Sequence, residues 1–96
     1  MADITPAELQ QRQQAGETPT IIDVREPWEH EERAILGSQN IPLGSLPDKL
    51  NELDELKDQE VIVHCKSGGR SAQAKAFLTS QGFTNVRNLL GGITAY

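Results

Sequence analysis

The chain has 96 residues, of which 36% are hydrophobic and 24% are charged, and its formal net charge is −5. This length fits one domain with one hydrophobic core, so we expect residues 1–96 to fold as a single domain. The acidic balance argues against non-specific nucleic-acid binding, and no apolar run approaches the roughly 20 residues that span a bilayer, so we expect no nucleic-acid or membrane partner.

The first third of the chain alternates helical and apolar patterns. Residues 5–8 read Thr-Pro-Ala-Glu, a capping box with proline at the first helical position. They predict a helix that runs to about Ala15 and ends at Gly16. The short apolar run of residues 20–24 predicts a buried strand, and the charged residues 26–34 predict a short helix or an ordered loop.

The remaining elements continue this alternation. Residues 40–43 suggest a short strand, and a stripe of leucines then predicts a helix: Leu46, Leu50, Leu53 and Leu56. Residues 60–65 form the strongest strand pattern because they include three consecutive β-branched side chains. Residues 71–81 predict a helix with Ala72, Ala76, Phe77 and Leu78 available to pack. Residues 86–89 predict a last strand, and Ile93 follows two glycines and opens a final helical turn.

This order predicts an α/β fold with a mostly parallel central sheet and helices on both faces. In such sheets, ligands bind outside the carboxyl ends of the strands. Cys65 is the only cysteine and ends the best strand, so it lies where a ligand is expected. One cysteine with His30 and His64 excludes a disulfide within the chain and predicts no metal site.

The segment after this strand has the composition of an anion site. Gly68 and Gly69 allow a tight curl that turns backbone N–H groups inward, and a helix starts directly afterwards. The unpaired N–H groups of that helix and the charges of Lys66 and Arg70 are expected to lower the pKa of Cys65. The same donors would stabilise a persulfide anion, Cys–S–S⁻.

The spacing bears on which anion is held. Four residues separate Cys65 from Arg70, whereas cysteine-dependent phosphatases place five residues between their cysteine and arginine. The loop of this chain therefore forms a smaller ring, which fits a terminal sulfur better than a phosphoryl group. Asp23 is a conceivable general acid for a phosphatase, but a turn or capping contact is the favoured interpretation.

Four segments together resemble a single-domain rhodanese over nearly the whole chain. They are Asp23–Glu26 with Glu29, Gly37–Leu43, Cys65–Ser71, and Leu90–Ile93 with Ala95. The cysteine loop is especially similar to that of rhodanese domains fused to adenylyltransferases of the molybdopterin and thiamine pathways.

The resemblance implies a thiosulfate sulfurtransferase without a redox or metal cofactor. Cys65 would attack a small anionic donor such as thiosulfate, and the resulting persulfide would pass its sulfur to cyanide, a thiol or a sulfur-carrier protein. The resemblance assigns the persulfide cradle to the residues after the nucleophile: Lys66, Ser67, Gly68, Gly69, Arg70 and Ser71. Within this set, Lys66 and Arg70 would attract and orient the donor.

The resemblance also implies that Asp23, Arg25 and Glu29 are mainly structural, with Arg25 held by nearby carboxylates. His64 precedes Cys65 on a strand, so its side chain is expected on the opposite face and in a structural role. Two departures from the family pattern stand out. Residues 33–35 differ from the usual sequence before the Asn40 stretch, and the chain stops at Tyr96, so the C-terminal helix of the family is expected to be missing or truncated.

Alternative functions stay open at this stage. A sulfur-relay domain of a larger adenylyltransferase system would receive sulfur from a cysteine desulfurase, and a Cys65-dependent phosphatase or arsenate reductase is disfavoured by the short loop. A non-catalytic binding module would have little need for Cys65 and Arg70. The N-terminus lacks the basic and apolar segments of a signal peptide, which favours the cytoplasm.

Overall fold

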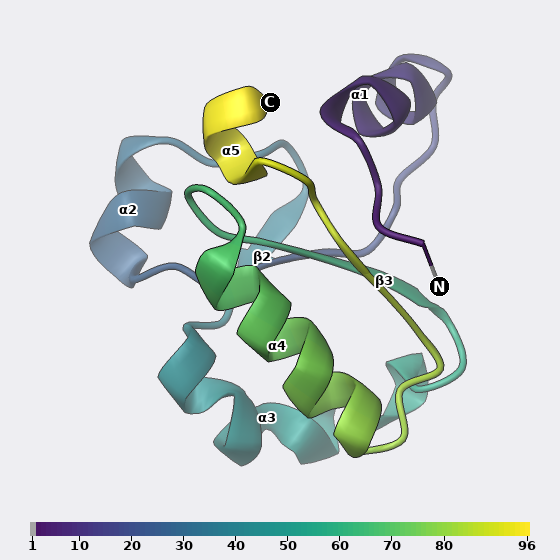
Figure 1. Cartoon of the computed structure of the whole chain (residues 1–96), viewed down its shortest axis with the longest axis vertical. Helices are drawn as coiled ribbons and strands as arrows, with labels where there is room; N and C mark the ends of the chain where they lie inside the picture. The colour runs from purple at the N-terminus through teal and green to yellow at the C-terminus, as the bar shows by residue number, and fades with distance from the viewer. Residues whose placement is uncertain (1) are drawn as a thin grey trace.

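The computed structural model describes residues 2–96 and contains a four-stranded parallel sheet. The strands lie in the order β2-β1-β3-β4, with every neighbouring pair parallel. Their bounds are β1 Ile21–Asp23, β2 Ser38–Asn40, β3 Glu60–His64 and β4 Asn85–Asn88. The predicted α/β class with a parallel sheet is confirmed. Because the strands are parallel, their carboxyl ends lie at the same end of the sheet (Figure 1).

Helices cover both faces of the sheet, as predicted. On one face, α3 (Leu46–Leu53) and α4 (Gly69–Ser80) pack over a core that includes Ile22, Val63 and Cys65. On the other face, α1 (Pro6–Gln14) and the short α5 (Gly92–Ala95) cover a second cluster. It consists of Ile4, Leu9, Ile21, Ile35, Ile62, Leu89 and Ile93. Figure 1 shows these two pairs of helices on opposite sides of the strands.

Three short elements complete the chain, and one of them corrects a prediction. They are α2 (Pro27–Glu32) and two 3-10 turns, η1 (Leu43–Ser45) and η2 (Asp54–Leu56). The strand expected at residues 40–43 is wrong in its bounds, because pairing with β1 covers Ser38–Asn40. Pro42 has no N–H to donate to a ladder and instead precedes the 3-10 turn that leads into α3.

The helix after Cys65 starts two residues earlier than predicted. Its N-cap is Gly68, whose φ of 113° lets the chain turn directly into helix at Gly69. The inward face consists of Ser71, Ala74 and Leu78, whereas the predicted packing residues Ala72 and Ala76 are exposed. Ser71 thereby lies against Cys65 at the end of β3.

None of the helices in residues 2–96 is both long and apolar enough to cross a membrane.

A buried polar cluster around Asp23 connects the end of β1 to α2. The carboxylate of Asp23 is fully buried and accepts hydrogen bonds from Arg25 Nε at 2.9 Å and Arg25 Nη2 at 2.8 Å. His30 Nδ1 lies 2.9 Å from the same carboxylate. Burial acts to raise the pKa of Asp23, but the bonds from Arg25 and His30 hold it below its usual value. The structural role expected for Asp23 and Arg25 is consistent with this geometry.

Replacing Asp23 by asparagine is expected to destabilise the fold by about 3 kcal/mol, because it leaves the buried guanidinium of Arg25 without a counter-charge. Urea unfolding of Asp23→Asn measures this free energy, and Asp58→Asn at an exposed position is the matched control. Equal stability of the two variants would contradict the prediction.

Candidate active site

Cys65 directly follows β3 and is buried at the carboxyl end of the sheet, with 1% of its surface exposed. Its side chain belongs to the core cluster beneath α4. The preceding His64 is fully buried beside Asp23, with Nε2 3.9 Å from Oδ1 and Nδ1 3.2 Å from the carbonyl oxygen of Cys65. Burial, the largest influence, holds the pKa of His64 below its usual value, so the ring is neutral at pH 7. Its contact is with the backbone of Cys65 and not with the sulfur.

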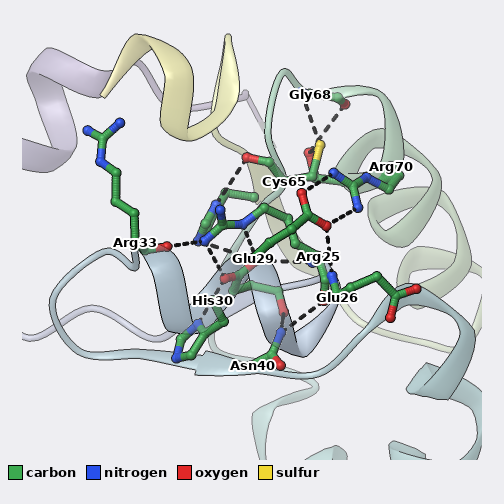
Figure 2. Close-up of polar contacts among 12 residues, drawn as sticks. Arg25, Glu26, Glu29, His30, Arg33, Asn40, Cys65, Gly68 and Arg70 are labelled. Carbon is green, nitrogen blue, oxygen red and sulfur yellow. Dashed lines mark hydrogen bonds and ion pairs between the residues drawn. The ribbon is translucent and has the colours of Figure 1, made fainter.

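Hydrogen-bond donors from the following loop converge on the sulfur. The backbone N–H of Gly68 donates to Sγ at 3.0 Å (Figure 2). The hydroxyl of Ser71 lies 3.4 Å from Sγ. Gly68 can turn its N–H inward because its φ is positive. The first residues of α4 follow at once, so the positive end of that helix faces the same point.

On the side of the loop away from the sulfur, backbone N–H groups of α5 donate hydrogen bonds to the carbonyl groups of the loop. Ile93 N–H donates to the Cys65 oxygen at 3.0 Å, and Thr94 N–H donates to the Lys66 oxygen at 3.1 Å. Gly92 permits this approach, since a β-carbon there would lie 2.4 Å from the Lys66 oxygen. With these carbonyls held on the far side, the loop can turn N–H groups toward the sulfur. The sequence places Gly91 and Gly92 at the end of a strand and in a segment that resembles the family, but it does not predict their contact with the cysteine loop.

These contacts decide the ionisation of the thiol. Burial acts most strongly and raises the pKa of Cys65, as it does for any thiol removed from water. The Ser71 hydroxyl and the backbone N–H groups of Ser71, Gly68 and Ser67 act in the opposite direction, and together they bring the pKa below its ordinary value. The arrangement therefore shifts the equilibrium toward the thiolate, the nucleophilic form.

Asn88, at the end of β4, supports the loop and was not anticipated from the sequence. Its Oδ1 accepts from the Ser71 hydroxyl at 2.6 Å, and its Nδ2 donates to the Gly68 oxygen at 3.3 Å. A hydroxyl has one hydrogen, so Asn88 competes with Cys65 Sγ for the Ser71 donor. No motif marks Asn88, and only the adjacency of β3 and β4 reveals its role.

Arg70 is bound by a carboxylate from α2. Its guanidinium makes a two-pronged ion pair with Glu29, with Nη1–Oε1 at 2.7 Å and Nη2–Oε2 at 3.0 Å (Figure 2). The hydrogen bond from Arg70 is the main cause that lowers the pKa of Glu29 to about 2. Glu29, expected to be mainly structural, is thereby joined to the cysteine loop.

The predicted site residues are therefore placed at different depths. Cys65 and Ser71 are buried, Gly68 and Arg70 are half-buried, and the outer rim consists of Lys66, Ser67 and Gly69. Within residues 2–96, no hydrogen bond or ion pair engages the Lys66 ammonium. Among these residues, no three His, Cys, Asp or Glu side chains gather in a way that could hold a metal ion.

Comparison with known proteins identifies relatives of this architecture. The profile of the rhodanese-like domain matches residues 5–96. A sulfurtransferase of Allochromatium vinosum is 36% identical over 94 residues, which cover 98% of this chain and 86% of that protein. The probable adenylyltransferase/sulfurtransferase MoeZ of Mycobacterium tuberculosis is 39% identical over 97% of this chain, which spans 24% of the longer protein. A rhodanese-like domain protein of Staphylococcus aureus has a solved structure that superposes with a TM-score of 0.88. It is 30% identical and covers 99% of this chain and 90% of its own.

Removing the Ser71 hydroxyl is expected to raise the pKa of Cys65, because one of the donors that stabilise the thiolate is lost. The rate of alkylation by iodoacetamide, followed against pH, gives this pKa as its midpoint. In Ser71→Ala the midpoint should move to higher pH by about 0.5 to 1 unit. Ser67→Ala removes an exposed hydroxyl and should leave the midpoint in place. A shift of equal size in both variants would argue against the assigned contact.

Gly92→Ala is expected to destabilise the fold by about 2 kcal/mol or more and to slow alkylation of Cys65. The added methyl group would meet the Lys66 oxygen at 2.4 Å, and the φ of 62° disfavours a side chain. Gly44→Ala is the control, since a β-carbon added there would meet nothing within 4 Å and the φ of Gly44 is not positive. Urea unfolding and the alkylation rate test both effects, and a stable, fully reactive Gly92→Ala would refute them.

Proposed function

The chain belongs to the rhodanese-like domain family, and from that premise we propose that it transfers sulfane sulfur through a persulfide on Cys65. Homologues named sulfurtransferases support sulfur transfer in general. The observation that carries the assignment to Cys65 is the N–H of Gly68 at 3.0 Å from Sγ, at the base of a ring of donors. Such a ring stabilises negative charge on sulfur without requiring a cation in contact with it.

Thiosulfate is one proposed small-molecule donor. The Cys65 thiolate attacks the outer sulfur, a new S–S bond forms to Cys65, and the S–S bond of thiosulfate breaks to release sulfite with the bonding electron pair. The total charge of −3 is divided between sulfite, with −2, and the persulfide anion, with −1. In the second step, a nucleophilic acceptor attacks the terminal sulfur and restores the Cys65 thiolate.

The loop residues have separate roles in this proposal. The backbone from Lys66 to Ser71, with Gly68 and Gly69 at the bend, cradles the terminal sulfur. The exposed ammonium of Lys66 attracts an anionic donor at the rim, and Arg70, in the first turn of α4, helps to orient it to the extent that its ion pair with Glu29 leaves its charge available. The acceptor is cyanide in an assay and a thiol or a sulfur-carrier protein in the cytoplasm, where small thiols are abundant.

A relay role is the second proposal. A matching domain occurs inside the longer M. tuberculosis relative, whose name combines adenylyltransferase and sulfurtransferase. In such a setting, Cys65 would receive its sulfur from another protein and deliver it to a carrier. Fast loading by a cysteine desulfurase combined with slow loading by thiosulfate would favour the relay, and the reverse would favour the small-molecule enzyme.

Treatment with thiosulfate is expected to add the mass of one sulfur atom to the purified protein, and cyanide should remove it again with formation of thiocyanate. Cys65→Ser should gain no mass and should lose at least about 1,000-fold of the transferase rate, because no nucleophile remains at the site. Intact-mass spectrometry and thiocyanate detection measure the two steps. A wild-type protein that takes up sulfur from neither thiosulfate nor a persulfide would overturn the proposed function.

A further inference from the structure

We propose that Glu29 sets the class of sulfur donor: by neutralising Arg70, it favours hydropersulfides, R–S–S–H, over the thiosulfate dianion. This inference rests on the proposed persulfide chemistry of Cys65. It goes further by assigning selectivity to a residue outside the cysteine loop. Glu29 touches no reacting atom and acts through Arg70, so it is a positioning residue.

The Glu29–Arg70 pair is built into the fold and differs from an ordinary surface ion pair. Both guanidinium nitrogens that face Glu29 are used, at 2.7 and 3.0 Å, and only 11% of the Glu29 side chain is exposed. The backbone N–H of Glu26 also donates to Glu29 Oε1 at 3.0 Å, which fixes the carboxylate at the start of α2. A two-pronged bond to a carboxylate fixed in this way keeps Arg70 from turning freely toward a ligand.

The charges near the sulfur nearly cancel as a result. Glu29 offsets Arg70, and the neighbouring Asp23 and Arg25 offset each other in a buried pair. The Cys65 thiolate acts on Arg70 through space, although Glu29 is the main cause that raises the pKa of Arg70. Lys66 is then the remaining cation of the cysteine loop, and it lies exposed to solvent. The cradle therefore offers N–H dipoles and about one positive charge.

The two donor classes make different demands on that charge. Attack of the Cys65 thiolate on thiosulfate brings together a total charge of −3. Attack on a hydropersulfide brings together −1: the outer sulfur bonds to Cys65, the S–S bond of R–S–S–H breaks, and RS⁻ leaves with the bonding pair. The proton on the transferred sulfur then passes to RS⁻, so the products are the Cys65 persulfide anion and RSH. When Glu29 neutralises Arg70, the reaction with thiosulfate loses a stabilising positive charge, whereas the reaction with a hydropersulfide needs that charge less.

Four variants test the pair by the ratio of two loading rates. The rate of sulfur addition to Cys65 is measured by intact mass with thiosulfate and with an alkyl hydropersulfide that carries no other charged group. The variants are Glu29→Gln, Arg70→Gln, the double variant, and Glu32→Gln as control. Glutamine still accepts the capping bond from Glu26 and so preserves α2, and the Glu32 control removes the same charge from an exposed position of the same helix.

The two single variants at the ion pair are expected to change the rate ratio in opposite directions. Glu29→Gln frees the charge of Arg70 and should raise the thiosulfate-to-hydropersulfide rate ratio about tenfold, mainly through KM for thiosulfate. Arg70→Gln leaves the carboxylate unbalanced and should lower the ratio. The double variant restores a neutral pair and should return near the wild-type ratio, while Glu32→Gln should keep it.

A ratio that stays unchanged in Glu29→Gln while both donors load Cys65 would overturn the assignment of Glu29 and leave the persulfide function standing. Failure of every donor to load the wild-type protein would instead refute the function itself. Because the ratio compares two donors on one folded protein, a general loss of stability cannot imitate the expected change.

Discussion

The site depends on one constraint: the peptide groups after Cys65 must turn their N–H bonds toward the sulfur and their carbonyls away from it. Backbone carbonyls near a buried thiolate would repel its charge, and carbonyls left without partners would themselves be costly. The structure satisfies both requirements because α5 donates N–H groups to the oxygens of Cys65 and Lys66. The positive φ of Gly68 then presents its N–H to Sγ at 3.0 Å. The four-residue helix α5 is therefore part of the site, although it contributes no side chain to it.

A second support comes from the opposite side of the loop and links the edge of the sheet to the site. Asp23 at the end of β1 binds Arg25 and His30, and this holds α2 against the sheet. Because α2 is fixed in this way, Glu29 lies where it can meet Arg70 from α4. The buried ion pair of Asp23 and Arg25 thus positions the charge partner of the cysteine loop. The contacts around Asp23 and those of the cysteine loop therefore form a single network.

The parts of this arrangement that the sequence predicts are local. The β-branched run before Cys65, the two glycines and the helix behind them follow from short-range preferences, and they place the cysteine at the carboxyl end of β3. Contacts between distant segments could not be predicted. Asn88 meets Ser71 because β4 pairs with β3, and Gly92 meets Lys66 because α5 returns across the loop. The bounds of β2 were also missed, because its three polar residues carry no apolar pattern and pair only through the neighbouring β1.

Fixed dipoles, more than cations, stabilise the negative charge on the Cys65 sulfur. In a protein with net charge −5, the sulfur is stabilised mainly by neutral N–H and O–H donors, while the guanidinium of Arg70 is offset by Glu29. Fixed dipoles act over short distances and are little screened by salt when they are buried, whereas a surface cation acts over longer distances and is screened. Such a ring stabilises a single negative charge on sulfur, in the thiolate and in the persulfide alike. It gives little added attraction to a second or third charge. In the proposed chemistry, the backbone therefore supplies the reactivity of Cys65, and the Glu29–Arg70 pair determines the selectivity between donors.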